Sequence, residues 1–163
     1  MRSYFICLIA ILFIGMGIIP QTHAEQINAW TKQFESTFSA SCKVGNISFR
    51  YPKQFEFSET TMGVFIETDQ LSGRIDTGSI KLRTREAATK LLVDKQGGKS
   101  ISESIVNGHT VFASTSIQGD QTCRTYIVVP QKEDTPLYIQ FRWKSGNPVD
   151  YTPMLNKIVA TIK

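Results

Sequence analysis

Four basic residues that lie close together in the sequence could recognise an anionic partner. Lys81, Arg83 and Arg85 alternate, so on a β-strand their side chains would share one face, and Lys90 follows nearby. The negative charge would come from an acidic protein, a lipid headgroup or a polysaccharide. The alternative is an exposed edge strand whose cationic side chains prevent aggregation, which is the commoner role of such residues. Both interpretations stay open at this point.

The tetrapeptide Asp76-Thr77-Gly78-Ser79 has the form of an aspartic-peptidase active-site segment. In those enzymes two close aspartates share one proton, because neighbouring carboxylates cannot both ionise. A chain of this length supplies one such aspartate, so the enzyme would have to be a homodimer. Arg74 stands where an apolar residue should lead into the aspartate. We therefore favour an ordinary polar turn and keep the homodimeric peptidase, with Asp76 as its catalytic residue, as the alternative.

Other catalytic and metal-binding patterns are missing from the sequence. His109 is the only histidine after residue 24, and one histidine does not build the usual zinc site. No serine lies in a Gly-x-Ser-x-Gly motif, and the segment 97–100 (GGKS) lacks the first glycine of a phosphate-binding loop. We expect no cofactor, no metal and no enzymatic activity.

Residues 1–24 have the features of a cleavable secretory signal. Arg2 precedes an uninterrupted apolar run of fifteen residues over 5–19, and Pro20 and a short polar stretch ending in Ala24 follow. That run is shorter than the roughly 20 residues that a membrane-spanning helix needs. The sequence therefore predicts a periplasmic or secreted protein with no transmembrane segment after cleavage.

Residues 25–163 are long enough for one domain with a hydrophobic core. Without the signal the chain has 17 basic and 14 acidic residues, a net charge of +3. This charge is too small to indicate nucleic acid as a partner. Cys42 and Cys123 are the cysteines that remain, and in an oxidising compartment such a pair is most simply a disulfide. Two buried thiols are the alternative.

The apolar spacing predicts a mixed fold. Three helices are expected, over 26–40, 86–96 and 148–161. Seven strands are expected, over 44–51, 62–68, 75–84, 100–106, 110–117, 122–130 and 137–144. Asn107-Gly108 is the strongest hairpin signal, and a loop with Phe55 and Phe57 should join the first two strands. This order predicts an α+β fold with a mostly antiparallel sheet.

Three segments resemble the Mog1p/PsbP-like domain family. They read ISFRYPKQFEF, VNGHTVFAS and LNKIVATIK, and the resemblance covers most of 42–163. It implies an α/β/α sandwich around an antiparallel sheet. Members of the family are binding or assembly factors, among them photosystem subunits, a small-GTPase regulator and bacterial envelope proteins. Many of those envelope proteins are lipoproteins, and this chain lacks their anchoring cysteine.

The sequence as a whole predicts an exported, non-catalytic binding or adaptor protein of the bacterial periplasm or extracellular space. A folded domain of this kind could also be a substrate of type II secretion. The expected partner is an unidentified protein or an anionic surface, and the residues expected to contact it are Lys81, Arg83, Arg85 and Lys90.

Overall fold

The computed structural model describes residues 38–53, 55–60, 63–95, 97, 100–131, 135–147 and 149–163. The predicted signal over 1–24 and most of the predicted helix over 26–40 lie outside the described residues. Ala40, the last residue of that predicted helix, instead begins a strand.

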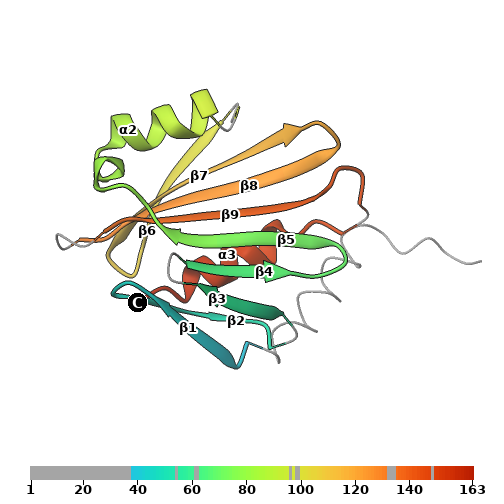
Figure 1. The fold of residues 1–163 in the computed structure, drawn as a ribbon. Coiled ribbons are helices and arrows are strands. Elements are labelled where there is room, and N and C mark those ends of the chain that lie inside the picture. The colour runs from blue at the N-terminus through green and yellow to red at the C-terminus, as the bar shows by residue number, and fades with distance from the viewer. Residues whose placement is uncertain are drawn as a thin grey trace, which may run out of the picture.

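An antiparallel sheet of seven strands forms the centre of the described structure (Figure 1). Its strands, in spatial order, are β3 (Glu56–Thr60), β4 (Gly63–Glu67), β5 (Leu71–Thr77), β9 (Leu137–Lys144), β8 (Gln121–Val129), β7 (His109–Gln118) and β6 (Ile101–Val106). A separate two-stranded sheet is formed by β1 (Ala40–Val44) and β2 (Ile47–Tyr51). The helical segments are η1 (Ile80–Arg83), α2 (Arg85–Lys90), η2 (Leu91–Lys95) and α3 (Thr152–Ala160). The predicted α+β class with a mostly antiparallel sheet is confirmed.

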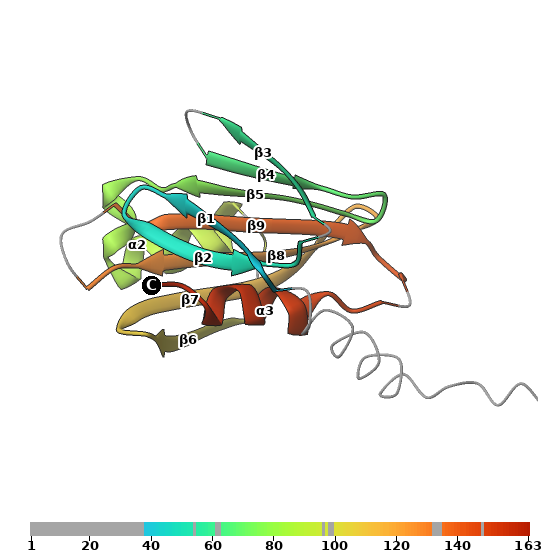
Figure 2. The same ribbon diagram turned by 90° about the horizontal axis from the view of Figure 1, so that it is seen from below.

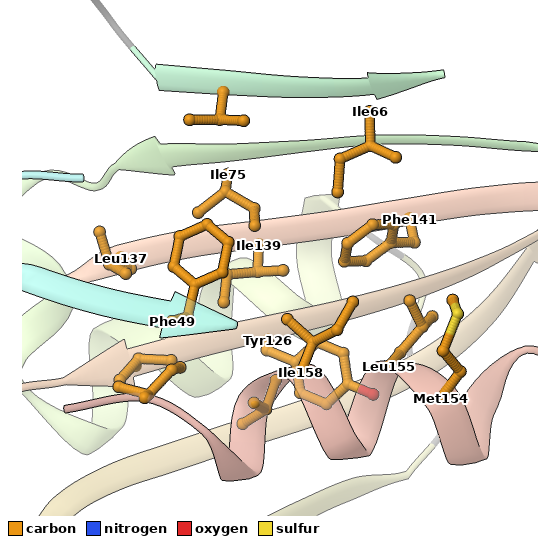
Figure 3. Close-up of a cluster of buried hydrophobic side chains, with 14 of the residues drawn as sticks. Phe49, Ile66, Ile75, Tyr126, Leu137, Ile139, Phe141, Met154, Leu155 and Ile158 are labelled. Atoms are coloured by element: carbon orange, nitrogen blue, oxygen red, sulfur yellow. The ribbon is translucent and has the colours of Figure 1, made fainter. Parts of the chain in front are cut away.

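The main hydrophobic core lies between one face of the large sheet and α3. We call this the α3 face. Strand β9 directs every second side chain into this core, and Ile139 and Phe141 are fully buried there (Figure 3). Leu155 and Ile158 of α3 and Phe49 of β2 cover them. Figure 2 shows α3 and the β1–β2 hairpin in front of the sheet and α2 behind it.

The opposite face of the sheet, which we call the α2 face, carries a smaller core. Ala88 and Leu92, both fully buried, pack there with Phe112, Ile127 and Tyr138. Each of these three strand residues has neighbours along its strand that belong to the α3 face, as the alternation of a strand requires. Helical segments therefore cover both faces, but the short α2–η2 segment packs on only one part of its face.

The segment after β5 differs from the sequence prediction. A strand was expected over 75–84, but β5 ends at Thr77 and η1 follows over Ile80–Arg83. Ser79 explains the change of structure, because its hydroxyl accepts a hydrogen bond from the Lys81 amide at 3.3 Å and caps the turn. The expected loop with Phe55 and Phe57 is also wrong in part, since 56–60 form edge strand β3.

Two asparagine side chains bond to the backbone, one in the segment before the last helix and one at a hairpin turn. Helix α3 starts at Thr152, later than predicted, after Asn147 Oδ1 has accepted a hydrogen bond from the Val149 amide at 3.0 Å. The predicted Asn107-Gly108 turn is confirmed, with φ of 48° and 85° as a type I′ turn requires. Asn107 Nδ2 also donates to the Ile162 carbonyl at 2.8 Å, so this turn holds the end of the chain.

A substitution at Gly73 would test how tightly the α3 face is packed. A Cβ atom at this position would lie 2.6 Å from Cε1 of Phe141, closer than real contacts allow. We expect Gly73→Ala to lower the free energy of unfolding by about 1–3 kcal/mol, as overpacking of a core does. Urea unfolding measures the change. Ser72→Ala, on the next residue and the other face, should stay within about 0.5 kcal/mol. An equal effect of both changes would contradict the packing described here.

Candidate functional site

The side chains on the α2 face change from apolar to polar along strands β5 and β9. Tyr138 ends the apolar part that α2 covers, and on the same face of β9 the chain continues with Gln140 and Arg142. On the neighbouring strand β5, Arg74 pairs with Gln140 and Ser72 pairs with Arg142. The cross-strand register therefore gathers two guanidinium groups, an amide and a hydroxyl on one part of the sheet.

A hollow of ≈ 240 Å³ lies over this polar part of the sheet. We call it the sheet-face hollow, and it is lined by Phe65, Ser72, Gly73, Arg74, Gln140 and Arg142. Phe65 of β4 forms an apolar wall and is 42% exposed. A second hollow of ≈ 640 Å³ shares Ser72 and Arg142 with the first and extends to Lys144. Arg142 therefore stands between two concave surfaces that an incoming molecule could reach.

A buried amide fixes the direction of the Arg142 side chain. Arg142 Nη2 donates a hydrogen bond to Gln140 Oε1 at 2.9 Å. Gln140 is only 3% exposed, and its Nε2 donates in turn to Thr125 Oγ1 at 3.5 Å. A guanidinium held by a hydrogen-bonded, buried partner loses less freedom when it binds a ligand. Among the described residues, no carboxylate lies within ion-pair distance of Arg142.

Arg74 is held in a different way from Arg142. Its Nε lies 3.4 Å from Asp76 Oδ2, and its guanidinium stacks over the ring of Tyr138 at 5.1 Å from the centroid. The Asp76 carboxylate offsets part of the charge of Arg74. Of the two arginines in the sheet-face hollow, Arg142 is therefore the one whose charge no described carboxylate offsets.

The basic row predicted from the sequence is not formed. Lys81 and Arg83 lie on η1, where three residues make a turn, so residues two apart point in different directions. Arg85 is the first residue of α2, and its Nε lies 3.1 Å from Glu103 Oε2. Lys90 pairs with Asp94 at 2.5 Å, and this contact raises the pKa of the Lys90 ammonium group. The expectation of a single strand face was wrong because the segment leaves the sheet at Thr77.

The Asp-Thr-Gly-Ser segment lies at the end of β5, next to the sheet-face hollow. Asp76 is a strand residue opposite Tyr138, and its described ionic partner is Arg74. The amide of Gly78 donates to the Pro136 carbonyl at 2.6 Å. The segment is therefore a strand end followed by a capped turn, and it places Asp76 beside an arginine.

The two cysteines lie on opposite faces of the large sheet. Cys42 of β1 belongs to the core on the α3 face. Cys123 of β8 lies on the same face as Ile127, which belongs to the α2 side. The structure does not join them, so it lacks the predicted Cys42–Cys123 disulfide, and a bond between them would have to cross the sheet. Burial raises the pKa of the Cys123 thiol, and the nearby charge of Arg142 partly opposes this shift.

His109 and the other candidate ligands do not assemble a metal site in the part of the chain that the structure describes. No group of three His, Cys, Asp or Glu side chains is found there. Nδ1 of His109 is buried and has no hydrogen-bond partner among the described residues. None of the described helices is long and apolar enough to cross a membrane.

Comparisons with known proteins give a similarity of fold alone. No family model and no curated protein matches the chain. A crystal structure of a protein from Bacteroides thetaiotaomicron matches with a TM-score of 0.55 and 14% sequence identity. The match covers 77% of this chain and 48% of that one, so this chain spans about half the length of the Bacteroides protein.

The placement of the cysteines predicts the outcome of peptide mapping. Digestion of the unreduced protein should give Cys42 and Cys123 in separate peptides, because the sheet lies between them. In the folded protein Cys123 should react slowly with alkylating reagents, since the thiolate is the reactive form and burial disfavours it. Recovery of a cross-linked Cys42–Cys123 peptide from freshly purified protein would contradict the arrangement of the two faces.

Proposed function

We propose that this chain is an exported, non-catalytic binding protein of the periplasm or extracellular space, and that it holds an anionic ligand in the sheet-face hollow. The observation that carries the proposal is the geometry of Arg142. Its guanidinium faces a hollow, is oriented by the buried amide of Gln140, and has no carboxylate partner among the described residues.

The ligand that fits this site carries a carboxylate or phosphate group. Arginine presents several donors in one plane and binds such oxyanions through paired hydrogen bonds. One donor nitrogen of Arg142 is engaged by Gln140, which leaves the other nitrogens for the ligand. Ser72 adds a hydroxyl and Phe65 an apolar wall beside it. The combination suits a small oxyanion that enters the hollow beside the Phe65 ring.

A binding role agrees better with the side chains of the hollow than catalysis does. Its charged side chains, Arg74 and Arg142, are hydrogen-bond donors, and no carboxylate or histidine is among the described residues that line it. The homodimeric aspartic peptidase remains the alternative. It needs two carboxylates that share a proton, and the ion pair of Asp76 with Arg74 counts against that arrangement.

We further propose that the fold is the α/β/α sandwich of the Mog1p/PsbP-like family. The two covered faces of the antiparallel sheet and the Tyr51-Pro52 pair at the end of β2 support this assignment. Export rests on the signal-like residues 1–24, and the sequence is equally compatible with periplasmic residence and with type II secretion. Binding to other molecules without catalysis is typical of that family.

Isothermal titration calorimetry of the purified protein with citrate and, separately, inorganic phosphate tests the proposed site. We expect one of these anions to bind, and Arg142→Gln to weaken its binding by about tenfold or more. A hydrogen bond to a charged group contributes roughly 1.5–3 kcal/mol, which corresponds to such a factor. Binding should also weaken as salt is added.

Lys81→Gln is the matched control for this experiment. It removes one positive charge from η1, outside the sheet-face hollow, and so changes the net charge equally. We expect it to leave the affinity within about twofold of the wild-type value, since a distant exposed charge is screened. Equal losses of affinity in Arg142→Gln and Lys81→Gln would mean that anion binding depends only on the net charge of the protein. If neither anion binds, the oxyanion site is refuted.

A further inference from the structure

Strand β6 ends the large sheet with an exposed edge. It spans Ile101–Val106, and no described strand pairs with its outer side. Proteins commonly protect such edges with lysine or proline, but β6 (ISESIV) contains neither. Ile105 is 79% exposed there. The edge is thus open to another strand, and Glu103 is the one charged residue in its sequence.

The hairpin geometry determines which backbone groups of β6 face outward. In a two-residue type I′ hairpin, the residues next to the turn form a hydrogen-bonded pair, here Val106 with His109. Backbone hydrogen bonds alternate along a strand, so Ser104 and Ser102 also face β7. The amide and carbonyl groups of Ile101, Glu103 and Ile105 therefore point away from the sheet.

We propose that the outer edge of β6 binds a second copy of this chain, with the two β6 strands antiparallel and the two-fold axis at Glu103. The segment 101–105 reads Ile-Ser-Glu-Ser-Ile, the same in both directions. Antiparallel pairing about its central residue therefore places each residue opposite an identical type. The three outward-facing residues of each copy exchange both of their backbone hydrogen bonds with the partner strand. This self-complementarity identifies a second copy as the occupant of the edge.

The side chains also fit this pairing. Ile101 lies opposite Ile105 of the partner subunit on both sides of the axis, and such apolar cross-strand pairs stabilise antiparallel sheets. Glu103 meets Glu103 of the partner subunit at the centre, where like charges repel. Arg85 lies 3.1 Å from Glu103 in each copy and offsets that repulsion. The isoleucine pairs therefore favour contact between the two edges, and the two Arg85 side chains reduce the repulsion between the glutamates at the two-fold axis.

The proposed dimer is independent of the anion site and of the peptidase alternative. Strand β5, which carries Asp76, lies four strand spacings from β6, about 19 Å at roughly 4.8 Å per strand. Pairing of the β6 edges therefore keeps the two Asp76 side chains far apart. The sheet-face hollow also lies over β4, β5 and β9 and is left open.

Sedimentation velocity over a range of protein concentrations tests the dimer. We expect the wild-type protein to shift from monomer to dimer as its concentration rises. Ile105→Lys should remain a monomer over the same range, because the lysine would lie at the pairing edge beside the partner strand. Ile117→Lys, a matched change at an isoleucine that is also highly exposed but lies on β7, should dimerise like the wild type. A monomeric wild type throughout, or equal effects of both changes, would overturn the proposal.

Cross-linking tests the position of the two-fold axis even if the association is weak. Opposite residues in a hydrogen-bonded antiparallel pair have Cα atoms about 5.5 Å apart, within the range of a disulfide. Glu103→Cys should therefore form a covalent dimer on mild oxidation. Ile117→Cys should not, and circular dichroism should show that both variants are folded. Absence of cross-linking in Glu103→Cys, or equal cross-linking in both variants, would contradict pairing centred on this residue.

Discussion

The alternation of side chains along β9 is the constraint on which the rest of the structure depends. Ile139 and Phe141 enter the core beneath α3, while Gln140 and Arg142 between and beside them emerge on the other face. A shift of one residue in the pairing of β9 would turn Ile139 and Phe141 out of the core and bring Gln140 and Arg142 into it. Burial of the Phe141 ring and exposure of the Arg142 guanidinium therefore require the same register. The glycine at position 73 opposite Phe141 belongs to this arrangement, because it leaves room for the ring.

The polar part of the α2 face has an energetic cost that a purely structural sheet would avoid. Ser114, Thr125 and Gln140 are buried there on neighbouring strands, and burial of polar groups is unfavourable unless they are hydrogen-bonded. Gln140 is bonded to Thr125 and Arg142, whereas Ser114 Oγ has no hydrogen-bond partner in the part of the chain that the structure describes. Apolar side chains, such as Ile127 and Tyr138 under α2, would be the simpler choice. In the proposed site, the buried amide of Gln140 orients Arg142 toward the ligand.

The sequence predicted the elements whose signals are local. The Asn107-Gly108 turn and the strands on both sides of it follow from turn chemistry and alternation, and the structure has them. The segment after Thr77 was mistaken for a strand, since alternating Lys81 and Arg83 fit a period of two while the Ser79 cap favours a helical turn. The Ser79 cap favours a helical turn and the alternation favours a strand, and the structure has the helical turn.

The candidate site was missed for a different reason. Arg74 and Arg142 are far apart in the sequence, and only the pairing of β5 with β9 brings them together. A local signal did exist, because the segment 137–144 alternates between apolar residues and residues with polar groups. The sequence did not reveal which end of that polar face α2 would cover. An oxidising compartment predicts a disulfide between the two cysteines, but it carries no information on the sheet that lies between them.

Nuclear magnetic resonance of the purified protein during titration with citrate or inorganic phosphate is the most direct measurement of the central claim. We expect the largest shifts at the guanidinium of Arg142, the side-chain amide of Gln140 and the backbone of Ser72, which line one hollow. Shifts concentrated at Lys81, Arg83 and Lys90 instead, with Arg142 and Gln140 unchanged, would contradict it.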